Sequence, residues 1–151
     1  LAVRRGLGTG ACWGKRDWGG VCNGFQITRA AHVHSKWQAF LVFDASSGTG
    51  TCWGDPEAGG DCSHVDLRGV RRVHANWHAF LALSPREGTG ACWGDASRGG
   101  SCDGLDFRDV TDVYTTVSAF LALDRTRGRG LCWGDATQGG QCAHLNFSGA
   151  E

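Results

Sequence analysis

Apolar and polar residues alternate with a period of two along several stretches of the chain, as expected for β-strands. The stretch 70–77, VRRVHANW, places three side chains on one face: Val73, Ala75 and Trp77. The equivalent stretches forty residues to either side carry Val33, Ser35 and Trp37, and Val113, Thr115 and Val117. We expect this face to point into a hydrophobic core, which makes Trp37 and Trp77 core residues, and we expect the opposite face to be polar.

Two more strands follow each alternating stretch. An apolar run, AFLAL at 79–83, predicts a short buried strand, and the link SPREG at 84–88 leads to the next strand, TGACWG. A Gly-Gly turn and a short alternating piece, Val65-x-Leu67 in one copy, come next and suggest a fourth short strand. No stretch favours a helix. The pattern therefore predicts an all-β fold with three to four antiparallel strands in each repeat.

The same elements return every forty residues. A Cys-Trp-Gly … Gly-Gly-x-Cys box occurs four times, with its tryptophan at Trp13, Trp53, Trp93 and Trp133. A fixed period of this length is typical of a solenoid, propeller or array, in which each unit buries a face against the next. We expect the four box tryptophans to be packing anchors between units. We expect one repeat domain over residues 1–151, a four-bladed propeller or an open arc, with tandem units of approximately 1–38, 39–78, 79–118 and 119–151.

Each box carries two cysteines ten positions apart. The Gly-Gly turn reverses the chain between them and brings the two within disulfide distance. Eight cysteines in register favour four disulfides inside the units: Cys12 with Cys22, Cys52 with Cys62, Cys92 with Cys102, and Cys132 with Cys142. A zinc site shared between units and a cysteine nucleophile are the alternatives. Disulfides predict an oxidising compartment: the thylakoid lumen, a secretory lumen or the extracellular space.

Composition limits the classes of partner. Lys+Arg and Asp+Glu balance at 15 each, so neither nucleic acid nor an anionic membrane surface is favoured. Apolar runs such as AFLVF at 39–43 are too short to span a bilayer. No motif indicates a cofactor. The chain contains no methionine, position 1 included, from which we expect a processed form or a fragment.

Two sets of polar residues recur in register. An aspartate follows the box Trp-Gly in three units, at Asp55, Asp95 and Asp135, and we expect it to accept backbone N–H groups in the turn. The alternating strand carries His34, His74 and Tyr114 at equivalent positions on its polar face. We expect the histidines to be solvated or hydrogen-bonded surface groups, with a pH switch or a metal ligand as the alternative.

The turn tips differ most between units and suggest a recognition surface. They read KRDW, DPEA, DASR and DATQ at 15–18, 55–58, 95–98 and 135–138. Variable loops on a constant frame are where binding residues concentrate. Trp18 breaks the repeat at such a tip, and we expect it to be exposed. The candidate partner contacts are Trp18, Arg16, Glu57, Arg98 and Gln138.

The run AFLAL-turn-GTGACWGD-x3-GG, followed by a V-x-x-V strand, resembles the repeat of RCC1-like and BLIP-II-like β-propellers, in a cysteine-paired variant. The resemblance covers essentially the whole chain and rests on structural motifs. It implies a propeller-like arrangement, and it implies a secreted binding protein as one possible function. The W-G-D and G-G pattern is also similar to arrays in proteins of photosynthetic algae.

No nucleophile–base pair, acid pair, phosphate loop or metal signature stands outside the repeat, so we expect no enzyme. The prediction is a non-enzymatic structural or interaction module. Its expected partners are protein subunits, because the chain would be an accessory subunit docked on a larger assembly in an oxidising compartment, such as the lumenal side of a photosynthetic complex. The alternative is a secreted binding protein of the adhesion or enzyme-inhibitor type.

Overall fold

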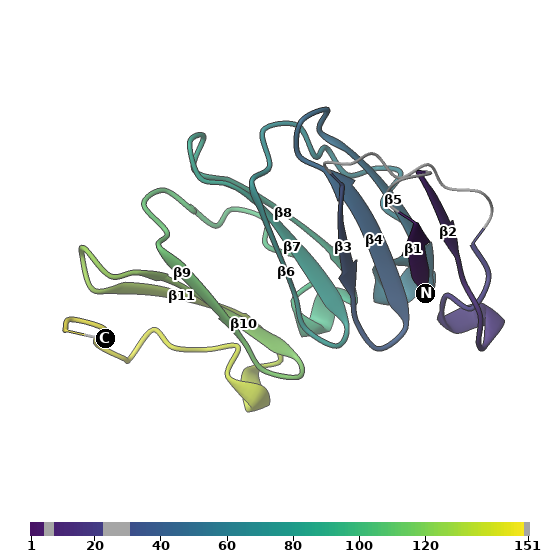
Figure 1. The fold of residues 1–151 in the computed structure, drawn as a ribbon. Helices are drawn as coiled ribbons and strands as arrows, with labels where there is room; N and C mark the ends of the chain where they lie inside the picture. Colours follow the sequence, from purple (N-terminus) through teal and green to yellow (C-terminus); the bar gives the residue numbers. More distant parts are fainter. Residues whose placement is uncertain (5–7, 23–30, 150–151) are drawn as a thin grey trace.

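The computed structural model describes residues 1–4, 8–22 and 31–149. It is an all-β structure of four antiparallel sheets, and this confirms the fold class predicted from the alternation. The sheets follow one another in chain order and stand side by side in a curved row, with the N-terminus near one end of the row and the C-terminus near the other (Figure 1).

The first sheet has two strands and the other three sheets have three strands each. The first sheet consists of β1 (Ala2–Arg4) and β2 (Thr9–Ala11). The second sheet consists of β3 (Ala31–Ser35), β4 (Ala39–Asp44) and β5 (Thr49–Gly54). The third sheet consists of β6 (Arg72–Ala75), β7 (Ala79–Ser84) and β8 (Thr89–Gly94). The fourth sheet consists of β9 (Asp112–Thr115), β10 (Ala119–Asp124) and β11 (Arg129–Gly134).

Within each three-stranded sheet the apolar strand lies in the middle. In the third sheet, Leu81 of β7 pairs with His74 of β6 on one side and with Cys92 of β8 on the other. The suggested fourth strand does not form in the three units in which this piece is described: 65–67, 105–107 and 145–147 are irregular chain between two turns. Each sheet therefore has three strands, the lower of the two expected numbers, apart from the two-stranded first sheet.

The hydrophobic core lies between neighbouring sheets. Alternate residues of the middle strand β7 contact opposite neighbours: Phe80 and Ala82 pack with the second sheet, whereas Leu81 and Leu83 pack with the fourth. Both faces of a middle strand are consequently buried, and Phe80 and Leu81 have no exposed surface. Each interior sheet thus depends on both of its neighbours for burial, as expected for a stacked repeat.

The box tryptophans fasten each unit to the preceding one. The Trp93 indole Nε1–H donates a hydrogen bond of 3.2 Å to the Gly59 carbonyl of the preceding unit, and the ring stacks on Phe80 with centroids 5.1 Å apart. Trp53 and Trp133 repeat both contacts. The prediction that these tryptophans anchor one unit to the next is confirmed for these three.

All eight cysteines form the four disulfides predicted from their spacing: Cys12–Cys22, Cys52–Cys62, Cys92–Cys102 and Cys132–Cys142. The pairing leaves no thiol for a shared zinc site or a nucleophile. Each bond closes a loop within one unit, which contributes roughly 3 kcal/mol of stability in the chain-entropy model. Four disulfides indicate an oxidising environment, lumenal or extracellular.

Candidate functional site

Short turns and hairpin loops gather along one edge of the row of sheets. The turns are η1 (Arg16–Trp18), η2 (Pro56–Gly60), η3 (Ala96–Arg98) and η4 (Ala136–Gln138). They lie beside the β3–β4, β6–β7 and β9–β10 hairpins, at the lower edge in Figure 1. Backbone bonds join the two sets, for example Asp95 N–H to the His78 carbonyl at 3.0 Å. This edge carries all the candidate contact residues.

The aspartates at the start of these turns act as expected. Asp55, Asp95 and Asp135 each accept a hydrogen bond from the backbone N–H two residues on, at 3.0, 2.9 and 2.8 Å. The Thr137 hydroxyl and backbone N–H hold the pKa of the Asp135 carboxyl below its usual value. These carboxylates therefore stabilise the turns that present the variable tips.

Trp37 and Trp77 lie in the hairpin loops and are not core residues, so that prediction is wrong. They are 54 % and 48 % exposed. The reason is that β3 ends at Ser35 and β6 ends at Ala75, so the alternation no longer governs the residues two positions further on. The equivalent Val117 is also exposed, in the β9–β10 hairpin.

Three exposed tryptophans form a continuous row along this edge. Trp18, which is 40 % exposed as predicted, lies 6.1 Å from Trp37 between ring centroids, in a tilted arrangement. Trp37 stacks on Trp77 at 4.9 Å with an angle of 15° between the rings. The Lys15 ammonium lies 4.1 Å from the centroid of the Trp18 ring. We call Trp18, Trp37 and Trp77 the tryptophan edge. Two units contribute to it, since Trp18 and Trp37 belong to unit 1–38 and Trp77 to unit 39–78. The sequence repeat gave no indication of this contact.

Polar groups lie next to the tryptophan edge. A hollow of about 610 Å³ is lined by both hairpin tryptophans and by three residues in register, Lys36, Asn76 and Thr116. Asn76 donates to the Arg98 carbonyl at 2.7 Å and Thr116 donates to the Gln138 carbonyl at 2.9 Å, so both hold a hairpin to a turn. The site thus combines aromatic rings with hydrogen-bonding groups fixed by the backbone.

Lys36 differs from its two counterparts. Its ammonium lies 4.6 Å from the Phe80 ring centroid, and within the described part of the chain it has no hydrogen-bond partner. Burial lowers the pKa of Lys36 to about 7, although Asp55 and Asp95 act in the opposite direction. A substantial fraction of Lys36 is therefore neutral at pH 7.

The remaining candidate contacts are exposed but do not form one cluster. Arg16, Glu57, Arg98 and Gln138 each occupy a different turn tip along the edge. Two of them lie beside the tryptophan edge: Arg16 is in the same turn as Trp18, and the Arg98 guanidinium lies 3.3 Å from His78 Nδ1, one residue after Trp77. Burial and the Arg98 guanidinium lower the pKa of His78. Glu57 and Gln138 occupy other turns along the row.

The repeated histidines are half-buried between sheets, which corrects the expectation that they are surface groups. His74 lies on the face of β6 that packs toward the fourth sheet, and its buried Nε2 has no hydrogen-bond partner among the described residues. Burial lowers the pKa of both His34 and His74. Tyr114, in the same register, is exposed because no described sheet covers its face.

Residues 1–4, 8–22 and 31–149 contain no group of three His, Cys, Asp or Glu side chains placed to hold a metal ion. No helix within these ranges is long and apolar enough to cross a membrane. Comparison of the chain with protein-family models and with curated proteins gives no match.

Proposed function

We propose that the chain is a non-enzymatic interaction module that binds a protein partner through the tryptophan edge. The observation that carries this proposal is the row of three exposed tryptophans in contact, supplied by two units, with Trp37 stacked on Trp77 and Trp18 tilted against Trp37. Contiguous exposed apolar patches on soluble proteins mark interaction sites. Tryptophan is also among the residues that contribute most to binding energy at interfaces.

The edge is arranged for binding before a partner arrives. The backbone N–H of Trp77 donates a hydrogen bond of 3.2 Å to the Val117 carbonyl, and this bond fixes the hairpin that carries the Trp77 ring. Because Trp37 stacks on Trp77, both rings lose little conformational freedom on binding. Lys15 and Arg98 at the ends of the edge are exposed cations, and they favour a partner surface that combines apolar groups with carboxylates.

The finer features of the function rest on the sequence. We propose that the row of sheets is propeller-like and that the chain docks as an accessory subunit on a larger assembly. The disulfides support a partner that is exposed to the same oxidising environment. The lumenal side of a photosynthetic complex is the specific assembly we favour, and a secreted adhesion or inhibitor protein is the alternative.

The test compares binding by matched tryptophan variants. The disulfide-intact chain is used to purify partners from the source organism's lumenal and extracellular fractions, and the affinity of the recovered protein is then measured. We expect Trp37→Ala to weaken this binding by about 2 kcal/mol, roughly 30-fold, the range of an interface hot spot.

Trp13→Ala is the matched control, because Trp13 is 65 % exposed and lies outside the tryptophan edge. It should bind the partner as the wild type does. Equal recovery of the partner by the wild type, Trp37→Ala and Trp77→Ala would contradict the proposal. The fraction in which the partner is found distinguishes a lumenal subunit from a secreted binding protein.

A further inference from the structure

The contact between consecutive units occurs three times with one geometry. It therefore shows which groups of one unit pack against the next. In each case the box indole donates to a glycine carbonyl of the preceding unit at 3.2 Å. A phenylalanine of the incoming middle strand covers the same glycine. A Cβ built on Gly99 would lie 2.6 Å from the Phe120 ring. The corresponding distances are 2.6 Å from Gly19 to Phe40 and 2.9 Å from Gly59 to Phe80.

In each contact the later unit supplies the box tryptophan and the earlier unit supplies the glycine carbonyl; we call these the incoming and the receiving half. The first unit carries an incoming half that has no partner among the described residues. Trp13 occupies the box position and is 65 % exposed, whereas Trp93 is 2 % exposed. Its indole N–H has no acceptor within the described residues. Ala2 of β1 is exposed and stands in register with Ala82 and Ala122, which are small and buried where they meet the preceding sheet.

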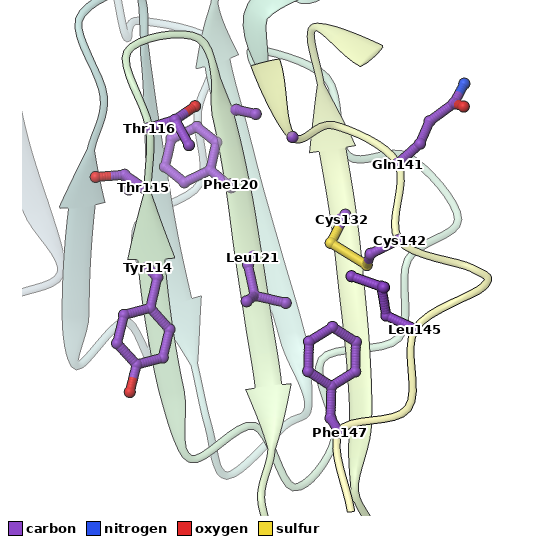
Figure 2. Close-up of a pocket in the computed structure, with 12 residues that line it drawn as sticks. Tyr114, Thr115, Thr116, Phe120, Leu121, Cys132, Gln141, Cys142, Leu145 and Phe147 are labelled. Carbon is purple, nitrogen blue, oxygen red and sulfur yellow. A yellow bond between two sulfur atoms is a disulfide. The ribbon is translucent and has the colours of Figure 1, made fainter. Parts of the chain in front are cut away.

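The last unit presents the receiving half. A hollow of about 250 Å³ on its outer face is lined by Leu121, Phe147, Leu145 and the Cys132–Cys142 disulfide (Figure 2). Leu121 is partly exposed, although its counterparts Leu41 and Leu81 are fully buried under the next sheet.

Gly139 marks the same open position in the backbone. It corresponds to Gly99, but a Cβ built on it would meet only the Thr116 methyl carbon at 3.6 Å. No hydrogen bond to the Gly139 carbonyl is found in the part of the chain that the structure describes. The acceptor and the space that a box tryptophan needs are therefore both present and unfilled.

We propose that two copies of this chain associate head to tail, with the first unit of one copy docked on the last unit of another. The Trp13 indole N–H donates to the Gly139 carbonyl of the second copy, and the ring enters the hollow beside Leu121 and Phe147. The occupant is a second copy because Gly139 presents the carbonyl and the open space that a box tryptophan of this chain meets at Gly19, Gly59 and Gly99. The chain carries 15 basic and 15 acidic residues, so net charge does not keep two copies apart.

The two surfaces differ from each other, so the contact is heterologous and leads to a closed ring or an open chain of copies. The contact joins separate molecules, so the association depends on protein concentration.

Sedimentation velocity of the disulfide-intact chain over a wide concentration range tests the proposal. We expect the wild type to form species of two or more copies. Trp13→Ala removes the incoming group, and Leu145→Glu places a carboxylate at the receiving hollow. Leu145 is already 53 % exposed, so this variant folds. Each variant alone is expected to remain monomeric.

The decisive step is to mix the two variants. Trp13→Ala keeps an intact receiving face and Leu145→Glu keeps an intact incoming face, so an equimolar mixture should form one-to-one dimers. A monomeric wild type, unchanged association of Trp13→Ala, or a mixture that stays monomeric would each overturn the proposal. Trp37→Ala is the matched control and should associate as the wild type does. Loss of partner binding with retained self-association in Trp37→Ala would separate this contact from the proposed function.

Discussion

Six of the seven tryptophans fall into two groups with opposite surroundings. The interior box tryptophans Trp53, Trp93 and Trp133 are at least 91 % buried, and each donates its indole N–H to the preceding unit. The three tryptophans of the edge are between 40 % and 54 % exposed and contact one another in a row. Trp13 has the sequence setting of the first group and the exposure of the second.

The difference shows that position in the repeat decides burial only where a neighbouring unit is present. A box tryptophan is buried because the turn and glycine of the preceding unit cover it, and Trp13 has no described unit on that side. The edge tryptophans occur in some units and are replaced in others, so they are free of the constraint that packing between units imposes. Side chains of that kind are available for recognition.

The largest expected effect distinguishes the two groups by stability. Trp93→Ala should lower the free energy of unfolding by about 3–5 kcal/mol, because it removes a buried ring and leaves a cavity. Trp37→Ala should lower it by only about 0.5–1.5 kcal/mol, because the ring is half exposed and loses one aromatic stacking contact. Chemical denaturation of both variants with intact disulfides measures the difference. Similar losses in the two variants would refute the division into two groups.

A matched pair of glycines separates a covered face from an open one. Gly99 and Gly139 have nearly the same backbone conformation, with φ of 104° and 102°, so alanine is strained equally at both positions. Gly99→Ala also drives a methyl group into the Phe120 ring, whereas the position at Gly139 is open. Gly99→Ala should therefore be the less stable variant by about 1–3 kcal/mol, the usual cost of overpacking.

This comparison is made at low protein concentration, at which any self-association through Gly139 is negligible. Thermal and chemical unfolding of the two variants should rank them in the same order. Equal stability of the two would mean that Phe120 moves aside and that the glycine is not required by the contact.

A smaller effect is expected at Lys36, the buried cation next to an exposed tryptophan. Its pKa is about 7 in the folded protein, below its value of 10.5 when exposed. Between these two values the unfolded chain binds more protons, so the free energy of unfolding rises as pH increases above 7. From pH 7 to pH 9 the wild type should gain about 1–2 kcal/mol relative to Lys36→Met.

Denaturation curves of both proteins at several pH values measure this gain. Lys15→Met is the control for removing a lysine, because the Lys15 side chain is exposed. The free energy of unfolding of this variant should follow that of the wild type across the same pH values. Parallel curves for the wild type and Lys36→Met would show that the amine remains charged or solvated in the folded state.

Sequence reasoning predicted the frame of the molecule well. The forty-residue period and the two-residue alternation specify the strands, and the spacing of Cys92 and Cys102 specifies their bond, because these are local properties repeated four times. The exposure of Trp18 could also be predicted, since that residue departs from the repeat within a turn.

The predictions failed where burial depends on neighbouring sheets. Alternation identifies one core face of a strand, but here sheets cover both faces, so His74 is half-buried although it lies on the face expected to be polar. The alternation predicts a core position for Trp77, but β6 ends at Ala75 and the pattern does not hold beyond the strand. The stacking of Trp37 on Trp77 joins residues forty positions apart and depends on how the units pack, which a single unit does not encode.

Every sulfur–sulfur bond in this protein joins residues ten positions apart, and none ties one unit to another. A force applied to the two ends can therefore detach units singly, since noncovalent packing, hydrogen bonds and the connecting chain are what resist separation. The segment between the two cysteines of each disulfide cannot be extended while the bond is intact. Under tension the row of sheets lengthens in steps, and each contact between units forms again when the force is removed.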